Sequence, residues 1–362
     1  NWFKDNIRMK TLITAGGHGT RLRPITHTQN KHLIPIANKK MLAYALEYSK
    51  NAGIDEAGII INSGDTSISE AFGNGESFGL KITYIEQSTP LGLGHVVKIA
   101  EPFIGKEPFI FYLGDNILVG GVNKFIEDFR SNRSNCHLVL SKVPDPNRFG
   151  VADVKDGRII GIEEKPDNPK SNLAVTGIYL YDNNIFEAVN NIAPSARGEL
   201  EISDAHQYLL DKGYIVSFSE ITGWWKDTGK PSDLLEANRL VLDNIKDNRM
   251  GTIDSSSIVS GRVVLGKNSK IINSNVRGPA IIGDNVVIDN AYIGPYSAIG
   301  NGCTILNSEI EYSILMNDCK ISNISRRIEA SLLGSDVHML RTKSKPVTHR
   351  FILGDQSRVE ID

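Results

Sequence analysis

The segment from residue 12 to residue 35, LITAGGHGTRLRPITHTQNKHLIP, combines a short apolar run with clustered glycines and cations. Gly16, Gly17 and Gly19 have no Cβ, so main-chain N–H groups there can approach a phosphate closely. Arg21 would add a planar fork of donors, and Lys31 would add a point charge. This pattern favours an anion-binding loop over its alternative, a tight turn with a solvated basic face.

Two familiar phosphate-binding motifs do not fit this loop. A P-loop requires GxxxxGK followed by Ser or Thr, whereas Arg21 stands five residues after Gly16. A dinucleotide fingerprint requires GxGxxG, whereas GHGTRL carries Leu22 where the third glycine belongs. The loop therefore meets the same physical requirement with a different motif.

Apolar runs typical of buried strands alternate with helical patterns over the first two thirds of the chain. The strand candidates are KTLIT, AGIIIN, LKITYIEQ, PFIFYLGDN and CHLVLSKV. A helix after the first of them has Asn38 as a candidate N-cap, Gly53 as a stop and one apolar face made of Met41, Leu42, Ala45 and Leu46. The alternation predicts an α/β fold with a mostly parallel sheet covered on both faces. Ligands collect at the carboxyl ends of such strands, which is where the glycine loop and LGDN stand.

The pattern changes after a helix expected near 231–246. From about Ser257, apolar β-forming residues recur every six positions, with one slip in register, at Val264, Val276, Ile282, Ile288, Ile293, Ile299 and Ile305. A period of six is typical of a left-handed parallel β-helix. The sequence therefore predicts a first domain over 9–245, a linker over 246–256, and a β-helix with a C-terminal tail over 257–362.

Composition limits the classes of partner. The chain has 362 residues and a net charge of −2, so no global field would attract nucleic acid or an acidic membrane. No apolar run approaches the ~18 residues of a membrane helix. The segment NWFKDNIR, which precedes Met9, lacks the apolar region of a signal peptide. Cys136, Cys303 and Cys319 lack metal-ligand spacing, so we expect reduced thiols in a cytoplasmic protein.

The glycine segment also resembles a family signature. AGGHGTRLRPITHTQNKHLIPIANKKML is similar to the pattern GGxGTRLxPxTxxxxKxLxPxxxKPM of the sugar-nucleotide pyrophosphorylases, which are sugar-1-phosphate nucleotidyltransferases with a Rossmann-like domain. Lys40 stands where that pattern has proline. The downstream motifs EQSTPLGLGHVV, FYLGDN, IEEKP, VTGIYLYD, GELEISD and WWKDTG follow in the family's order, covering about residues 10 to 240. With the six-residue repeats, the chain most resembles the long glucose-1-phosphate thymidylyltransferases.

The resemblance implies a reaction that joins two polyanions. The phosphate oxygen of glucose 1-phosphate would attack the α-phosphorus of dTTP in line, giving dTDP-glucose and pyrophosphate with the help of Mg²⁺. Asp115 and Asp227 correspond to the metal carboxylates of the family. Arg21 would contact the β- and γ-phosphates, and Lys31 would stabilise charge at the α-phosphate. Alignment and charge neutralisation would then supply most of the catalysis.

The resemblance also implies a nucleotide pocket around the glycine loop. A glutamine amide at Gln87 offers one donor and one acceptor to the imide edge of thymine or uracil, so UTP remains an alternative to dTTP. The complete set expected at the nucleotide is Leu12, Ile13, Ala15, Gly16, Gly17, Gly19, Thr20, Arg21, Gln87, Gly92 and Asp115.

A hexose phosphate is expected in a second pocket. Glu164 would accept sugar hydroxyls, and Lys165 and Arg197 would bind the phosphate. The complete set is Gly150, Glu164, Lys165, Val175, Tyr179 and Arg197. Phe149 stands where tyrosine is frequent in short members of the family, so the hexose is less firmly specified than the reaction. Trp224 and Trp225 are interpreted as core residues beneath the metal loop.

Two functions of other kinds remain as alternatives. Some relatives with a β-helix also transfer an acyl group, and His338 is the candidate general base for such a step. A catalytically silent regulatory paralogue is the other alternative, although Arg21, Lys31 and both acids are retained. The β-helix further predicts a homo-oligomer, a trimer or larger, and no partner among nucleic acids or membranes.

Overall fold

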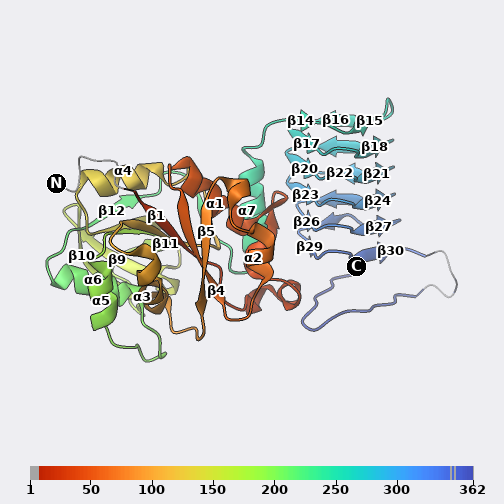
Figure 1. Cartoon of the computed structure of the whole chain (residues 1–362). Helices are drawn as coiled ribbons and strands as arrows, with labels where there is room; N and C mark the ends of the chain where they lie inside the picture. Colours follow the sequence, from red (N-terminus) through yellow and green to blue (C-terminus); the bar gives the residue numbers. More distant parts are fainter. Residues whose placement is uncertain (1–7, 343–344, 346–347, 362) are drawn as a thin grey trace. The chain divides into compact units, whose positions relative to one another are not determined.

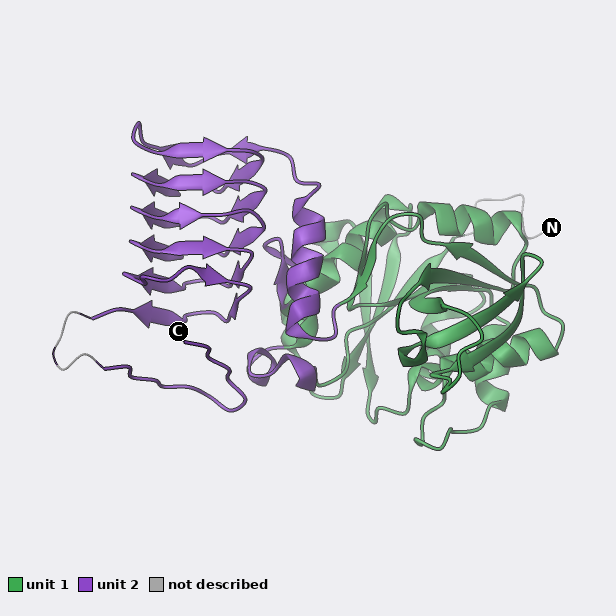
Figure 2. Ribbon diagram, turned by 180° about the vertical axis from the view of Figure 1, so that it is seen from behind, with its two compact units in different colours: residues 1–18, 30–33, 41–227 green, residues 19–29, 34–40, 228–362 purple. Residues whose placement is uncertain are grey.

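The computed structural model describes residues 8–342, 345 and 348–361 (Figure 1). The expectation that NWFKDNIR is not a signal peptide concerns mostly residues 1–7, which lie outside this range. The described chain forms two compact units, which are coloured separately in Figure 2. Unit 1 comprises residues up to 18, 30–33 and 41–227, and unit 2 comprises 19–29, 34–40 and the residues from 228 onward.

Unit 1 is built on a mixed, mostly parallel sheet. β1 pairs in parallel with β4 and β6, and β4 pairs in parallel with β5, while β11 runs antiparallel to β6 and β8. The main path through the sheet is β10-β9-β11-β6-β1-β4-β5, with β8 and β12 attached beside β11. The strands are β1 (Lys10–Thr14), β4 (Glu56–Asn62), β5 (Lys81–Gln87), β6 (Phe109–Leu113), β8 (Cys136–Lys142), β9 (Gly150–Lys155), β10 (Arg158–Glu164), β11 (Leu173–Tyr181) and β12 (Val216–Glu220). The α/β sheet expected from the apolar runs is confirmed.

Helices cover both faces of this sheet, and a hydrophobic cluster lies on each side. One cluster includes Leu42, Phe72 and Phe125, and the other includes Val97, Phe186 and Leu209. The helices are α1 (Met41–Asn51), α2 (Ser67–Phe72), α3 (Leu93–Ile104), α4 (Asn123–Ser131), α5 (Ile185–Asn191) and α6 (Ile202–Asp211). A separate antiparallel pair joins β7 (Asn116–Leu118) to β13 (Trp225–Asp227).

The N-cap expected at Asn38 is wrong. Asn38 has φ 59°, in the turn between β2 (Pro35–Ile36) and β3 (Lys39–Lys40), and α1 begins only at Met41. Its side-chain amide donates to the Ile299 carbonyl at 2.7 Å within unit 2. Asparagine tolerates the left-handed conformation that this turn requires, and this accounts for Asn38 without a capping role.

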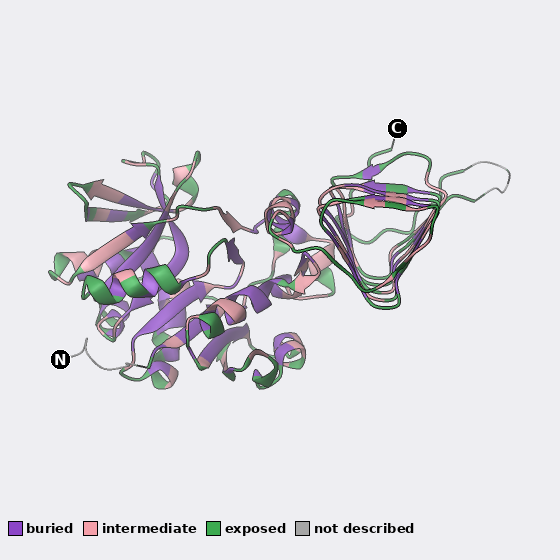
Figure 3. Cartoon of the chain, turned by 90° about the horizontal axis from the view of Figure 1, so that it is seen from above, coloured by how far each residue is buried: buried purple, intermediate pink, exposed green. Residues whose placement is uncertain are grey.

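Unit 2 contains the left-handed β-helix. Short strands stack in parallel into three sheets, and Figure 3 shows the coils superposed in a three-sided outline. The strands are β14 (Asn248–Arg249), β15 (Thr252–Ile253), β16 (Ile258–Ser260), β17 (Val263–Leu265), β18 (Lys270–Ile272), β19 (Asn275–Arg277), β20 (Ala280–Ile282), β21 (Val287–Asp289), β22 (Tyr292–Ile293), β23 (Ser297–Ile299), β24 (Thr304–Leu306), β25 (Glu309–Glu311), β26 (Ile314–Leu315), β27 (Lys320–Ser322), β28 (Ile328–Glu329), β29 (Leu332–Leu333) and β30 (His338–Leu340). β14 and β15 already belong to the stack, although they fall inside the segment 246–256 expected as a linker.

The coil length explains the slip in the six-residue repeat. Asn273, Asn290 and Asn307 occupy the same corner of successive coils, 17 residues apart, and their side-chain amides form a ladder with bonds of 3.1 and 2.8 Å. Each has a positive φ, between 44° and 47°. Asparagine accepts this conformation at low cost and also satisfies its own polar atoms by stacking.

Unit 2 also holds α7 (Pro231–Leu242), which ends before the predicted limit of 246. The Asn238 side chain of α7 accepts from the Ala37 N–H at 2.9 Å and donates to the Tyr296 carbonyl at 3.1 Å. This single amide therefore ties the helix to the β2–β3 hairpin and to a β-helix corner.

Two further features concern the cysteines and the hydropathy of the helices. Cys136, Cys303 and Cys319 are free thiols, and all three are buried. Within the described ranges, no helix has the length and apolar character needed to cross a membrane.

Candidate active site

The carboxyl ends of β1 and β6 bring the glycine loop and the LGDN motif to the same edge of the sheet. Thr14 and Leu113 are register partners, and the Gly114 N–H donates to the Thr14 carbonyl at 3.1 Å. A Cβ on residue 114 would collide with that carbonyl oxygen and with Leu42. Glycine is therefore needed for the close approach that places Asp115 directly after the strand.

Asp115 forms an ion pair with Lys31 in which Nζ lies 2.5 Å from Oδ2. The Asp115 and Lys31 side chains are 25% and 10% exposed, so the pair is shielded from water on most sides. Desolvation raises the pKa of the Asp115 carboxyl, but the neighbouring Lys31 charge and its hydrogen bond outweigh this and hold the pKa below its ordinary value. Asp115 is thus a carboxylate at neutral pH.

A side-chain network anchors Lys31, which begins the 3₁₀ turn Lys31–Leu33. The Asn30 amide donates to the Ala15 carbonyl at 3.0 Å and to Asp65 at 2.9 Å. Its Oδ1 accepts from both the backbone N–H and Nδ1 of His32, each at 2.9 Å, so the His32 proton lies on Nδ1. Burial lowers the pKa of His32 to about 4, which leaves the imidazole neutral at pH 7.

Asp227, the last residue of unit 1 in the sequence, lies in a strand that pairs with the residues following Asp115. In the antiparallel β7–β13 pair, Asp227 is the direct partner of Asn116, the residue that follows Asp115. Direct cross-strand partners have their Cβ atoms about 5 Å apart. Two acids that are far apart in sequence therefore come close along the backbone, because Asp115 immediately precedes the strand partner of Asp227.

The donor set fits a hard divalent cation. Among the residues that the structure describes, no group of three or more His, Cys, Asp and Glu side chains could hold a metal by itself. Mg²⁺ typically takes one or two protein carboxylates and completes its shell with water and substrate phosphates. Asp115 and Asp227 match this requirement.

The glycine loop is divided between the two units. In unit 1, the Gly17 N–H donates to the Asn62 side chain at 3.1 Å, and a Cβ on Gly16 would stand 3.0 Å from the same oxygen. In unit 2, Gly19 and Thr20 lead into the 3₁₀ turn Thr20–Leu22, and the exposed Arg21 guanidinium lies against Gly229 of the DTG motif. The side chains of Leu12, Ile13 and Ala15 are fully buried, so only their backbone could face a ligand.

Gln87, at the end of β5, is held by a residue that the sequence analysis missed. Its Nε2 lies 3.0 Å from Nδ1 of His95 in the first turn of α3. Since the Gln87 amide nitrogen can only donate, the neutral His95 ring accepts there. Gly92 packs against Leu200 and Glu199 of the GELE segment, and no other residue would fit there without displacement.

The residues expected at a hexose phosphate form a second cluster in unit 1. Glu164 is the register partner of Gly150, and a Cβ on Gly150 would approach Ser203, Glu164 and Val175. Ser203 donates to Glu164 at 2.7 Å, although sequence reasoning did not single it out from EISD. Cations flank Glu164, with Lys165 at 3.4 Å and Arg197 at 3.7 Å.

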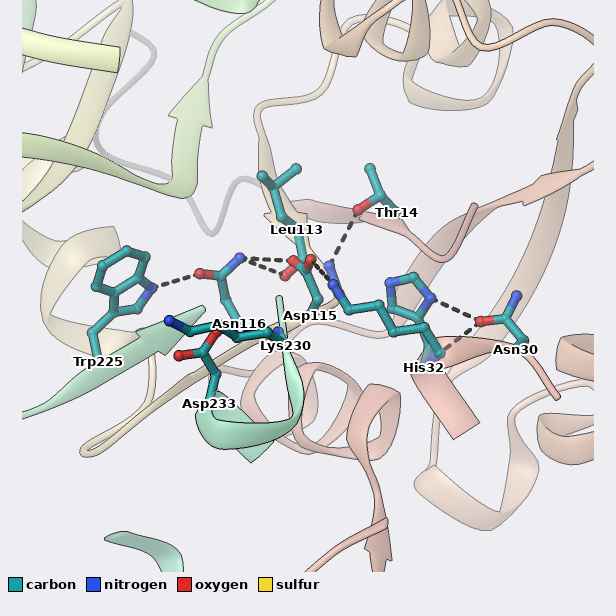
Figure 4. Close-up of polar contacts among 11 residues, drawn as sticks. Thr14, Asn30, His32, Leu113, Asp115, Asn116, Trp225, Lys230 and Asp233 are labelled. Atoms are coloured by element: carbon teal, nitrogen blue, oxygen red, sulfur yellow. Dashed lines mark hydrogen bonds and ion pairs between the residues drawn. The ribbon is translucent and has the colours of Figure 1, made fainter. Parts of the chain in front are cut away.

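Two residues differ from the settings expected for them: Tyr179, expected at the hexose phosphate, and Trp225, interpreted as a core residue. Tyr179 is buried, 4% exposed, between the Phe111 and His206 rings, so its ring belongs to the core behind this cluster. The interpretation of Trp225 as core packing alone is incomplete. Its ring is only partly buried against the core, and its Nε1 donates to the Asn116 side chain at 2.6 Å (Figure 4).

Comparison with known proteins identifies the family. The model of the nucleotidyl transferase family matches residues 10–244. The chain belongs to this family.

Its relatives extend the match through the β-helix. The chain is 48% identical to a glucose-1-phosphate thymidylyltransferase of Streptomyces antibioticus, over 98% of this chain and 99% of the relative. It is 42% identical to the low-salt glycan biosynthesis nucleotidyltransferase Agl11 of Haloferax volcanii, over 98% of this chain and all of the relative. A solved Bacillus anthracis structure, assigned as a glucose-1-phosphate thymidylyltransferase, is 39% identical with a TM-score of 0.62 and covers 67% of this chain and 98% of its own.

Proposed function

We propose that this nucleotidyltransferase condenses dTTP with glucose 1-phosphate, releasing pyrophosphate and forming dTDP-glucose. The pairing of Asp227 with Asn116, the residue that follows Asp115, carries the proposal, because it brings acids of two separate motifs to the same strand pair, and Lys31 binds the first of them. The names of the full-length Streptomyces relatives support the choice of nucleotide and sugar.

Asp115 and Asp227 would hold Mg²⁺, which when bound neutralises phosphate oxygens and aligns them for in-line displacement. Lys31 would release Asp115 and stabilise negative charge on the α-phosphate. Arg21 would bind the outer phosphates, with Gly229 leaving room for its guanidinium. No covalent intermediate on a side chain is needed, because the sugar phosphate is itself the nucleophile.

The nucleotide would be read by Gln87, and the hexose phosphate by Glu164, Lys165 and Arg197. Thymine and uracil present the same imide edge to a glutamine amide, so UTP is the second substrate to test. We further propose catalysis by residues 9–245, a cytoplasmic setting suited to the free thiols, and association of several chains through the β-helix.

A substrate panel tests the proposal directly. Pyrophosphate release is measured with dTTP, UTP, ATP, CTP and GTP against glucose 1-phosphate and its 2-acetamido analogue. The highest kcat/KM is expected for dTTP with glucose 1-phosphate. Asp227→Asn should abolish release, whereas Asp156→Asn, in the exposed β9–β10 turn, should leave it unchanged. Full activity of Asp227→Asn would refute the metal assignment.

A further inference from the structure

The side chain of Asn116 connects a proposed metal ligand to an indole. Asn116 is 3% exposed, and its Nδ2 donates to Asp115 Oδ1 at 3.1 Å and to the Leu113 carbonyl at 3.2 Å. Its Oδ1 accepts from Trp225 Nε1 at 2.6 Å (Figure 4). Since an indole N–H can only donate, the amide oxygen of Asn116 must face Trp225 and its NH₂ must face Asp115.

The hydrogen bonds from Trp225 through Asn116 hold one carboxylate oxygen of Asp115 independently of the other. Lys31 holds Oδ2, whereas Asn116 holds Oδ1. The proposed reaction requires Lys31 to leave Asp115 for a phosphate, so that restraint is lost when the substrates bind. The Asn116 contact involves a neutral, buried amide, and nothing in the reaction draws it away. The Asn116 amide therefore continues to restrain the Asp115 carboxylate after Lys31 has left.

We propose that Trp225, acting through Asn116, is a positioning residue that orients the Asp115 carboxylate for the divalent metal. This inference rests on the function proposed above. Trp225 needs no contact with substrate or metal for this role, because its N–H fixes the amide of Asn116 and that amide fixes Asp115. A carboxylate held in one orientation loses less rotational freedom when it binds a cation, so the restraint raises metal affinity.

The chain offers a clean substitution for the test. Trp225→Phe removes the N–H but retains an aromatic ring, which can keep the edge contact that Trp225 makes with Phe149 at a centroid distance of 5.8 Å. Trp224→Phe makes the same chemical change one residue away and leaves the hydrogen bond to Asn116 intact. Asp227→Asn defines how much binding comes from the proposed metal site.

Metal affinity is measured on the full-length protein with Mn²⁺ alone, following the free ion by electron paramagnetic resonance. We expect Trp225→Phe to raise the Mn²⁺ Kd roughly 2- to 10-fold, the effect of one hydrogen bond, and Trp224→Phe to leave it unchanged. The Mg²⁺ concentration giving half-maximal pyrophosphate release should rise by the same factor, with kcat at saturating Mg²⁺ retained. A purely structural role would lower kcat or the melting temperature instead.

A double-mutant cycle with Asn116→Ala gives a second test, which remains interpretable if a variant is partly destabilised. Because Trp225 acts only through Asn116, adding Trp225→Phe to Asn116→Ala should weaken Mn²⁺ binding no further. Additive losses, equal losses in Trp224→Phe and Trp225→Phe, or an unchanged Kd in Trp225→Phe would overturn the inference while leaving the proposed function intact. Mn²⁺ binding that Asp227→Asn does not reduce would instead refute the metal site, and the inference with it.

Discussion

Lys31 binds a carboxylate in the structure, whereas the proposed reaction assigns it to a phosphate. Both roles follow from its position, since the Asn30 network fixes the backbone of the turn while the ammonium group remains at the end of a flexible stem. In the absence of substrate, Lys31 offsets the charge of a shielded Asp115. Breaking such a pair by removing one partner leaves a poorly solvated charge.

Lys31→Met separates these two roles. We expect kcat to fall by about 10²–10³, the usual effect of removing one group that stabilises transition-state charge. Mn²⁺ affinity of the protein alone should rise, because the metal no longer competes with an ammonium group for Asp115. Titration calorimetry and pyrophosphate release measure the two effects. A simultaneous loss of metal binding would show that Lys31 supports the site rather than competing at it.

Buried histidines predict how stability responds to acid. His206 is fully buried, its Nε2 lies 2.6 Å from the Tyr181 hydroxyl oxygen, and burial lowers its pKa to about 3. Between pH 3 and about 6.5 the unfolded chain binds a proton at this residue and the folded chain does not, so acid favours unfolding. The free energy of unfolding should fall by about 1.4 kcal/mol per pH unit from this residue across that window.

Urea unfolding at pH 7, 6 and 5 checks this expectation. With falling pH, the free energy of unfolding should decline less steeply in His206→Gln than in the native chain. The control His349→Gln, at an exposed position, should decline as the native chain does. His137, also fully buried with a pKa lowered by burial to about 4, contributes a second decline of the same sign. A slope unaffected by His206→Gln would contradict the assignment of a neutral buried imidazole.

The junction of β5 with α3 brings together Gln87, the residue proposed to read the base, and its hydrogen-bond partner His95. Gln87 ends the strand, and His95 lies in the first turn of the helix. A neutral His95 accepts from the Gln87 nitrogen and so sets which atoms of that amide remain for a base. Burial and the Lys98 charge lower the pKa of His95, which preserves the acceptor at neutral pH.

His95→Phe should therefore loosen base selection. The KM for dTTP should rise roughly 2- to 10-fold, and the preference for dTTP over CTP should shrink, because cytosine presents the reversed donor and acceptor order. His95→Gln, which retains an acceptor, is the matched variant and should recover part of the preference. Because the pKa is lowered, the native preference should weaken with acid only below about pH 6.5. Unchanged discrimination in His95→Phe would exclude this role.

The same elements show which features the sequence could predict. β1, β4 and β6 are mostly apolar segments of five to seven residues, so the pattern predicted these strands and the position of Asp115 at a carboxyl end. The β2–β3 hairpin and β14 have two residues per strand, too short for any periodicity to reveal. The contacts from Trp225 to Asn116 and from His95 to Gln87 depend on how separate elements pack, and no local spacing encodes them.

The hydrophobic residues of the β-helix form a cluster separate from the clusters of the α/β sheet. The β-helix core includes Ile288, Ile305 and Ile321, stacked in β21, β24 and β27 and nearly inaccessible to water. Stability in such a stack is approximately a sum over neighbouring coils. A defect in a middle coil therefore weakens its contacts on both sides.

Ile305→Ala should lower the free energy of unfolding of the β-helix by about 2–5 kcal/mol, the usual cost of such a cavity. Trp224 and Trp225 both lie in unit 1, so their fluorescence reports that unit, whereas far-ultraviolet circular dichroism reports both. The substitution should advance the dichroism transition in urea ahead of the fluorescence transition. Coincident shifts of both signals would show that the two cores unfold as one.

The buried thiols can report when the segments around them open. Cys136 lies in β8 of unit 1, whereas Cys303 and Cys319 lie in successive coils of unit 2, and each is shielded from solvent. A thiol reagent can modify them only when the surrounding segment separates, so the reaction rate measures the opening equilibrium of that segment. Mass spectrometry of peptides from partly alkylated protein would therefore time the loosening of the sheet and of the coils independently, without introducing any label.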